Sequence, residues 1–373
     1  MARRGYDEVV LLTGFPSFRA RRMCEELLKA PRTFVHAVVH PKLADDARLA
    51  LDALPPGERT RVEVLEGDAA ALDLGLSGVE LRRVCAHVDT IHHMAQITYL
   101  GAERATAEQV NVGATREIVE VARVCPELRC LAVHSTALVS GDRAGLVLED
   151  ELDRRQGFRN VVEETLARAE KLARFAMGQL PVCVLRPTIM VGDSTTGEVD
   201  RFDGPYFLIL LLLTSPPDLP LPLPVRSETP LQLVPVDYVV RAAAAIARDR
   251  RAPGRTFHIG DPAPLSARRV FDLVAAAGGH RAAAGFIPAN ITKAILRTPG
   301  IDRFARSPRS FLDTLTTPVT YSMANTRELL ADSTIRCPPL ESYIDRLIAY
   351  VEERLRERRT RETREEEVWD PLL

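Results

Sequence analysis

Residues 8–20 read EVVLLTGFPSFRA. The apolar run over residues 8–13 ends at Gly14, which is typical of a buried parallel strand followed by a tight turn. A helix is expected next, from about residue 20 to residue 29. In a nucleotide-binding fold, this turn carries glycines at set spacing, so that the backbone can approach a pyrophosphate and the helix can pack on the strand. In that spacing the three positions are Gly14, Ser17 and Ala20.

The same alternation of strand and helix continues through the first half of the chain. Further apolar strands are predicted at residues 34–39, 62–65, 89–94, 131–134 and 182–185, with helical patterns at 78–86, 105–124 and 158–178. Strands that alternate with helices indicate a parallel sheet covered on both faces. The predicted fold is therefore an α/β doubly wound parallel sheet of the Rossmann type.

The pattern changes after about residue 195, where prolines gather between residues 216 and 230. Helical patterns return at 237–248, 266–278, 288–297 and 338–357. We predict a dinucleotide-binding domain over residues 1–194 and a smaller mixed substrate-side part over 195–350, interleaved with the first. Residues 351–373 form a charged C-terminal tail. The tail is read as a solvated helix end, with a docking segment for a protein partner, Trp369 included, as the alternative.

Composition excludes several classes of protein. The 373 residues carry a formal charge of −2 and are 46% apolar, which suits a globular protein and argues against a generally basic nucleic-acid binder. The six cysteines are scattered without a CxxC pair or zinc spacing, so no metal site is predicted. The longest apolar run, residues 206–213, is far shorter than the roughly 20 residues of a membrane-spanning helix. A cytoplasmic location is expected.

Several segments, in order, resemble the extended short-chain dehydrogenase/reductases, and most of all their fatty-acyl and thioester reductase branch, the "male sterility" type of NAD(P)-binding protein. The segments are LTGFP (12–16), GD (67–68) with LGLS (74–77), VDTIHHMA (88–95), NVGAT (111–115), STALVSG (135–141), LRPTIMVGDS (185–194), FDGPY (202–206) and VPVDYVV (234–240). The resemblance covers residues 8–350 and implies the same fold.

The resemblance implies a nicotinamide dinucleotide along the carboxyl ends of the strands. Its expected contacts are the residues of the first turn, two residues after the second strand, the acidic residue after the third strand and three positions further along. They are Gly14, Phe15, Ser17, Phe18, Ala20, His40, Lys42, Asp68, Ala95, Asn111 and Pro187. The segment after the second strand has no acid, so Lys42 or a protonated His40 could meet the 2′-phosphate of NADP. This favours NADP over NAD as the expected cofactor. The alternative is that Lys42 is an exposed lysine in a solvated loop without a role in binding.

The family's catalytic set is a Ser or Thr with a Tyr and a Lys four residues apart on one helix, where the Lys lowers the Tyr pKa for proton transfer. Thr136 fits the first position. The frame of residues 157–172 puts Val162 at the Tyr position and Leu166 at the Lys position. Lys171 lies about 140° around the helix from Leu166. Ser17 and Gln96 are further departures near the expected cofactor.

Three functions remain open on these residues. The first is a degenerate, catalytically impaired member that acts by binding a small ligand or a partner, with cofactor binding weak or lost. The second is an active NADP-dependent reductase of acyl thioesters or related carbonyl compounds. The third is a non-redox isomerase or lyase step on the same fold, using Thr136 or Glu163. Relatives often dimerise through helices that include residues 158–178, so a homodimer is an expectation by analogy.

Overall fold

The computed structural model describes residues 5–99, 101–214, 221–223, 228–278, 282–286 and 317–368. The predicted helix at 288–297, most of the proline-rich connection and Trp369 lie outside these residues. The described chain forms two compact units. The first comprises residues 1–190, 232–262 and 317–337, and the second comprises residues 191–231, 263–316 and 338–373. The predicted division at residues 194 and 350 stays a prediction.

The first unit is built on a parallel sheet of seven strands in the order β11-β7-β5-β4-β1-β2-β3. The chain runs outward from β1 to β3 on one side, then crosses to β4 and continues to β11 on the other. The change of direction falls between β1 and β4, where open α/β sheets bind ligands at the carboxyl ends of their strands. The strands are β1 (Glu8–Phe15), β2 (Thr33–Val39), β3 (Val62–Glu66), β4 (Thr90–His93), β5 (Cys130–His134), β7 (Val182–Pro187) and β11 (Thr256–Ile259).

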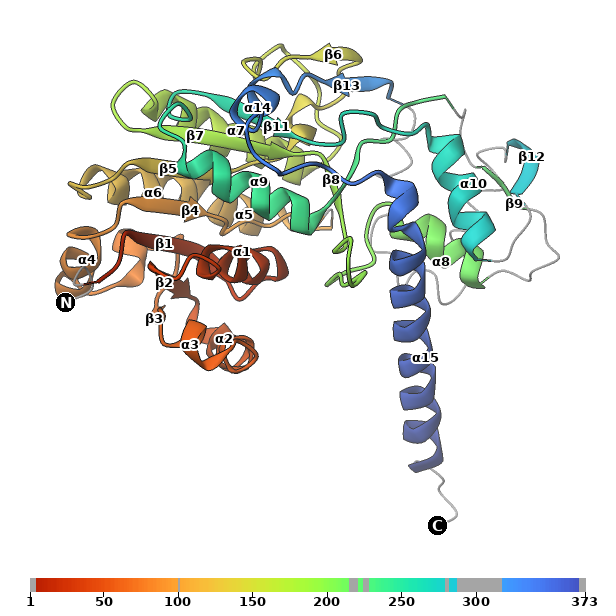
Figure 1. Ribbon diagram of the computed structural model, residues 1–373, viewed down its shortest axis with the longest axis horizontal. Coiled ribbons are helices and arrows are strands. Elements are labelled where there is room, and N and C mark those ends of the chain that lie inside the picture. Colours follow the sequence, from red (N-terminus) through yellow and green to blue (C-terminus); the bar gives the residue numbers. More distant parts are fainter. Residues whose placement is uncertain are drawn as a thin grey trace. The chain divides into compact units, whose positions relative to one another are not determined.

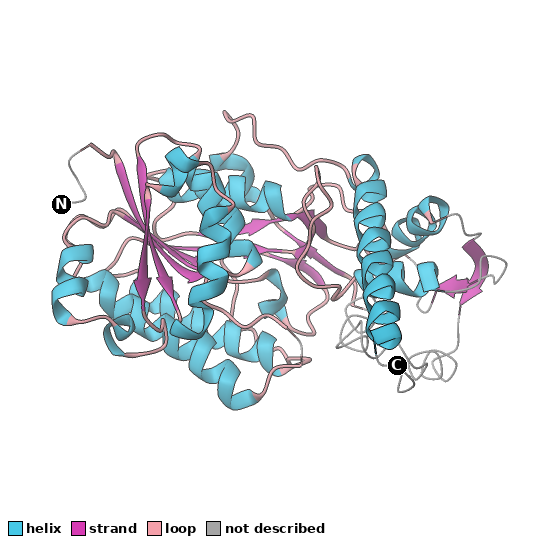
Figure 2. Cartoon of the chain, turned by 90° about the horizontal axis from the view of Figure 1, so that it is seen from below, coloured by secondary structure: helices cyan, strands magenta, loops and turns pink. Residues whose placement is uncertain are grey.

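Helices cover both faces of this sheet, as Figures 1 and 2 show. On one face Val10 and Leu12 pack with residues of α1 and α9, and on the other Val9 and Leu11 pack with residues of α4, α6 and α7. Both faces of β1 are therefore buried, which is why its sequence is a continuous apolar run. The helices of this unit are α1 (Phe18–Leu28), α2 (Ala44–Asp52), α3 (Pro56–Arg59), α4 (Gly78–Cys85), α5 (Arg104–Ala107), α6 (Ala114–Arg123), α7 (Val161–Ala176), α9 (Val236–Arg248) and α14 (Ala324–Leu329).

The predicted helix over 105–124 is interrupted. A π-helical turn over Glu108–Gly113 separates α5 from α6. Inside it, the Asn111 carbonyl accepts a hydrogen bond from the Thr115 hydroxyl at 2.7 Å, while the Asn111 side chain bonds outside the helix. Such turns widen a helix locally and re-aim a side chain. Residue pattern alone did not predict it.

Two short strand pairs complete the smaller elements near this sheet. β6 (Gly145–Val147) pairs with β13 (Val319–Tyr321), and β8 (Ile189–Val191) pairs with β10 (Leu233–Pro235). The β6–β13 pair brings the late segment 317–321 back to the first unit, next to the turn over Ala137–Ser140.

The second unit contains α8 (Tyr206–Thr214), α10 (Ala267–Ala277), α15 (Ile344–Val368) and the strand pair β9 (Leu221–Leu223) and β12 (Ala282–Phe286). The apolar run at 206–213 forms α8, whose Tyr206, Leu208, Ile209 and Leu210 are buried, and which contacts α10 and α15. In the described part of the chain, no helix combines the length and the apolar content needed to cross a membrane.

Candidate functional site

The carboxyl ends of β1, β4, β5 and β7 place most of the predicted site residues along one edge of the first unit. Because the strands are parallel and adjacent in the sheet, Gly14, Ala95, Thr136 and Pro187 all lie at that edge. This arrangement brings together residues separated by more than 170 positions in the sequence. It is the candidate site.

Gly14 is required by the close approach of β1 to the end of β4. Its φ is +86°, and a Cβ there would lie 2.5 Å from the Met94 carbonyl oxygen. The neighbouring Thr13 hydroxyl oxygen accepts hydrogen bonds from the backbone N–H groups of Met94 and Ala95, both at 3.1 Å. These contacts fix the turn after β1 against the segment that begins with Ala95. The sequence predicted the glycine for a phosphate, and the structure adds this backbone contact.

The N-terminus of α1 is open. Ser17 is its N-cap residue, yet its exposed side chain makes no capping hydrogen bond, and no acidic residue stands in the first turn. The first N–H groups of a helix have no partner within the helix, and they favour an anion. Phe18 and Ala20 are buried and anchor this turn to the core.

A dinucleotide fits this edge on two observations. The uncapped start of α1 suits a pyrophosphate, and the Gln96 Oε1 atom, next to Ala95, is buried without a hydrogen-bond partner among the described residues. Gly14, Ser17, Phe18 and Ala95 are the residues that would hold such a group, and their contacts with it stay predictions.

The residues expected near the adenosine end also have roles within the protein. The Asp68 carboxylate accepts a hydrogen bond from the backbone N–H of Ala70 at 2.9 Å, which stabilises the loop after β3. His40 Nδ1 accepts from the backbone N–H of Lys42 at 3.2 Å and caps a short turn, while Lys42 is exposed. A proton on Nδ1 would break this cap. The predicted contacts of Lys42 and His40 with the 2′-phosphate of NADP stay predictions.

Asn111 positions the segment after β4. Its side chain is fully buried, accepts from the Ile97 N–H at 2.8 Å, and donates to the Ile97 carbonyl at 3.1 Å and the Thr165 hydroxyl at 2.9 Å. The amide is thereby engaged at both ends and ties this segment to α7. Its predicted contact with a cofactor stays a prediction, as does that of Pro187, which ends β7.

The predicted catalytic positions on α7 are apolar and buried. Asn160 caps the helix by accepting from the backbone N–H of Glu163 at 2.9 Å. Val162 and Leu166, one turn apart, are 4% and 2% exposed and pack with Val139 and Ala167. None of these four side chains can carry a proton. Lys171 is exposed and pairs with Asp153 at 2.8 Å.

Thr136 caps the turn over Ala137–Ser140, where its hydroxyl oxygen accepts from the Leu138 N–H at 3.2 Å. The hydroxyl proton stays available for donation. The carboxylate of Glu163 accepts from the Arg159 backbone N–H at 3.0 Å and contacts its guanidinium at 3.2 Å. Burial raises the pKa of Glu163. The Glu163 carboxylate is therefore bound by Arg159 within the protein.

A buried network of charged side chains, which begins at Ser135 next to Thr136, was not predicted from the sequence. Glu170 on α7 accepts from the Ser135 hydroxyl at 2.7 Å and from Arg186 Nε at 2.9 Å. Arg186 and Glu170 are each 1% exposed, and Arg186 also contacts His258 at 3.2 Å. Burial, with the charge of Arg186, lowers the pKa of His258 to about 3. An arginine inside the apolar strand VCVLRP was the signal for this network.

Comparison with known proteins gives three findings. A family model described as "male sterility protein" matches residues 12–243. The chain is similar to the fatty acyl-CoA reductase wat of Drosophila melanogaster, with 24% identity over 65% of this chain and 54% of that protein. It is also similar to the glycine betaine reductase ATRR of Emericella nidulans, with 26% identity over 71% of this chain and 22% of that protein. The chain therefore spans about half or less of these relatives.

Solved structures share the fold. The terminal R domain of the myxalamid biosynthetic pathway matches with a TM-score of 0.78 at 24% identity, over 94% of this chain and 92% of that one. The reductase domain of a nonribosomal peptide synthetase from Mycobacterium tuberculosis matches with a TM-score of 0.68 at 21% identity, over 91% and 90% of the two chains. The predicted doubly wound fold is confirmed.

Proposed function

The chain belongs to the NAD-binding family described as male sterility protein, and we propose that it is a catalytically impaired member that acts by binding a ligand or a partner. The observation that carries this proposal is the apolar cluster of Val139, Val162, Leu166 and Ala167 on and beside α7. The resemblance expects a tyrosine and a lysine at the second and third of these positions. A packed aliphatic cluster can neither donate a proton nor lower the pKa of a neighbour.

The dinucleotide is part of this proposal as a bound ligand. The turn at Gly14 and the uncapped N-terminus of α1 support pyrophosphate binding, and the exposed Lys42 supports a preference for NADP. A nicotinamide dinucleotide supplies a hydride when it takes part in a reaction. The hydroxyl group of Thr136 can donate a hydrogen bond to a substrate oxygen. The side chains of Val162 and Leu166 cannot donate or accept a proton.

The first test separates binding from turnover. Purified protein is titrated with NADPH and NADH, followed by nicotinamide fluorescence and calorimetry. We expect NADPH to bind more tightly than NADH, and Lys42→Glu to remove the difference. Micromolar binding without oxidation of NADPH in the presence of acyl-CoA thioesters supports the proposal. If neither cofactor binds at millimolar concentration, the dinucleotide is not the ligand, and the proposal is left with a partner alone.

The second test restores the missing pair. The variant Ser17→Gly with Val162→Tyr and Leu166→Lys should gain NADPH-dependent reduction of acyl-CoA by a factor of about 10²–10⁴, the usual contribution of general acid catalysis. The matched control carries Ser17→Gly with Val162→Phe and Leu166→Met, which are similar in size but cannot ionise. Circular dichroism and thermal unfolding check that both variants fold.

The alternative is an active reductase of acyl thioesters or related carbonyl compounds. It is favoured by the intact framework: the family match over residues 12–243 and the preserved Thr136 turn. Under this reading the native protein already oxidises NADPH with an acyl thioester, and Thr136→Val abolishes the rate. That result would overturn the proposal of impairment.

A further inference from the structure

A pocket lies at the opposite edge of the sheet from the candidate site. Its volume is about 510 Å³, and it is lined by residues at the amino ends of β1, β4 and β5 and by the loop that leaves α9. These are Asp7, Glu8, Thr90, Arg129, Ala247, Arg248, Asp249, Arg250 and Pro253. Glu8 and Gly14 lie at opposite ends of β1, about 20 Å apart at roughly 3.3 Å per residue. The pocket is therefore separate from the dinucleotide edge.

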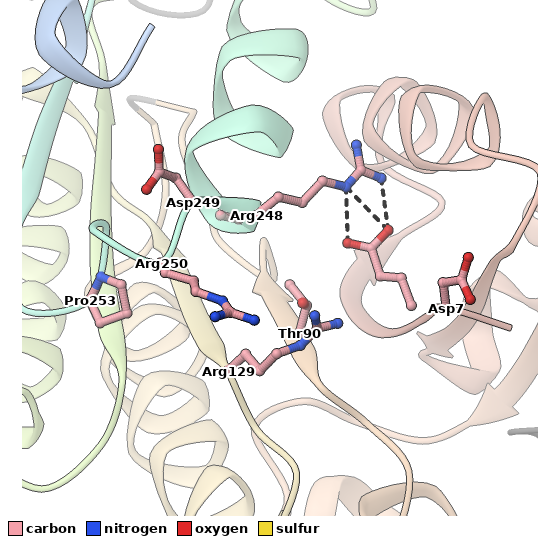
Figure 3. A pocket seen from close by; sticks show the side chains of 9 residues that line it. Asp7, Thr90, Arg129, Arg248, Asp249, Arg250 and Pro253 are labelled. Carbon is pink, nitrogen blue, oxygen red and sulfur yellow. Dashed lines mark hydrogen bonds and ion pairs between the residues drawn. The ribbon is translucent and has the colours of Figure 1, made fainter.

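The acidic residues of this pocket are already paired. Glu8 accepts from Arg248 Nε at 3.0 Å and Nη2 at 2.8 Å, which Figure 3 shows as dashed lines. Asp249 pairs with Arg251 at 2.6 Å. Asp7 pairs with Arg32 at 2.9 Å. Each carboxylate is thus neutralised by a guanidinium of its own.

The basic residues are not all paired in return. Arg129 contacts the buried Asp89 at 2.8 Å through Nη2, which leaves its other N–H groups free for further bonds. Arg250 is exposed and has no acidic partner among the residues that the structure describes. Figure 3 shows Arg250 and Arg129 among the residues that line the pocket, with their side chains running in roughly the same direction and Arg129 reaching Thr90. Two guanidinium groups that line one pocket carry like charges, and a bound anion offsets their repulsion.

We propose that this pocket binds a small phosphate-bearing molecule, with Arg250 and Arg129 as its anion-binding residues. Two guanidinium groups present planar sets of donors that match the oxygens of a phosphate. The paired acids leave one net positive charge, on Arg250, to attract the anion. The Pro253 ring and the Ala247 methyl group supply an apolar wall for the rest of the ligand. Such a ligand joins the loop after α9 to β4 and β5, and so stabilises the first unit.

The test uses the full chain and inorganic pyrophosphate as the probe. Calorimetric titration and thermal unfolding are measured with sodium chloride added to equal ionic strength in every sample. We expect pyrophosphate to bind and to raise the unfolding temperature. Hydrogen exchange should show protection in the peptides that contain residues 7–8, 90 and 247–253. Protection at residues 14–20 instead would place the anion at the dinucleotide edge and overturn the proposal.

The decisive variant is Arg250→Gln, because it removes the positive charge that has no acidic partner and breaks no ion pair of the described chain. Because the start of α1 is also proposed to accept a pyrophosphate, binding at the pocket is followed by the protection of residues 247–253, and the variant should weaken it at least about tenfold. The matched control is Arg116→Gln, which changes an exposed arginine on α6 away from the pocket. Equal binding by wild type and Arg250→Gln, or no binding by either, would contradict the proposal. The positive charge of Arg250 would then interact only with the negative, C-terminal end of the α9 helix dipole.

Discussion

Single buried side chains hold segments of the first unit together through contacts that the local sequence pattern does not predict. Thr13 holds two backbone N–H groups at the end of β4, and Asn111 holds both backbone groups of Ile97. Both polar side chains are buried and are satisfied within the protein, which is the usual condition for such groups. They fix the edge on which the predicted cofactor contacts stand.

At this scale the buried pair of Glu170 and Arg186 gives a prediction on stability. Glu170→Gln leaves the fully buried Arg186 without its counter-charge, and removing one partner of such a pair costs about 3–5 kcal/mol. The double variant Glu170→Met with Arg186→Met should lose less, since neither charge is then left unpaired. Urea denaturation measures both free energies of unfolding. A loss below about 1 kcal/mol for Glu170→Gln would show that water or another group takes over the pairing.

The sequence predicted some of these residues and not others, for a physical reason. Thr136 and the apolar pair on α7 were placed by the resemblance, because each family motif runs over neighbours a few positions apart in the sequence. The capping role of Asn160 was not predicted. Tyr321 bonds the Ser140 hydroxyl at 3.0 Å across 181 positions, and no pattern in either segment predicts that contact. The need for Gly14 to clear the Met94 carbonyl likewise appears only when β1 and β4 are adjacent.

At the scale of elements, the strand pattern predicted six of the seven strands of the sheet, from runs such as that of β1, which is buried and apolar. It missed β11. The helices were less well bounded. The break between α5 and α6 depends on Asn111 bonding outside its own helix, and α7 begins three residues later than predicted because Asn160 caps it. Element type follows from periodicity, whereas element ends follow from individual hydrogen bonds.

The central strands also give a prediction on pH. His92 and His93 on β4 are buried, and desolvation lowers the pKa of each to about 4. His134 on β5 lies 3.1 Å from His92 between ring nitrogens, and burial lowers its pKa well below the usual value. In the unfolded chain these histidines bind protons near pH 6.5, so the unfolded state takes up protons first as the pH falls. Their contribution to stability is complete above pH 6.5 and is lost between about pH 6.5 and 4.

The expected slope is about 1.4 kcal/mol per pH unit for each such histidine. Chemical denaturation at pH 7.5, 6.0 and 5.0 measures it above the range in which most carboxylates titrate. The variant His134→Gln removes one of the three groups and should reduce the slope by about one third of this set's contribution. A free energy of unfolding that stays constant from pH 7.5 to 5.0 would show that the native sheet accepts these protons.

At the scale of the whole molecule, the chain leaves the first unit at about residue 190 and returns to it at 232–262 and 317–337. The change in composition lies near residue 195, and the domain division predicted from it stays a prediction. We predicted that some later strands return to the first part, but not which ones. The sequences of β11, β13 and α14 do not indicate which sheet or strand each of them joins. Their places are set by contacts such as Asn325 with the Thr256 carbonyl at 2.8 Å, across 69 positions.

The second unit ends in α15, whose first turns are held by apolar contacts. Ile344, Leu347, Ile348, Val351 and Leu355 are buried at helical spacing, and α15 contacts α8 and α10 within the same unit. The residues between them, such as Glu352 and Arg354, are exposed. The buried stripe on α15, as far as its side chains are described, extends to Leu355, and the sequence beyond residue 358 is dominated by charged residues of both signs.

Truncation separates the two parts of this helix. Removing residues 359–373 should leave the unfolding temperature of the full chain within about 2 °C, since charged residues of a helix end contribute only a few tenths of a kcal/mol per pair. The single substitution Leu347→Ala should instead cost about 2–5 kcal/mol, because it empties a fully buried position. A large loss on truncation would show that the charged segment packs on the protein. If the truncated chain keeps its stability but loses a partner that the full chain captures, the tail is the docking segment.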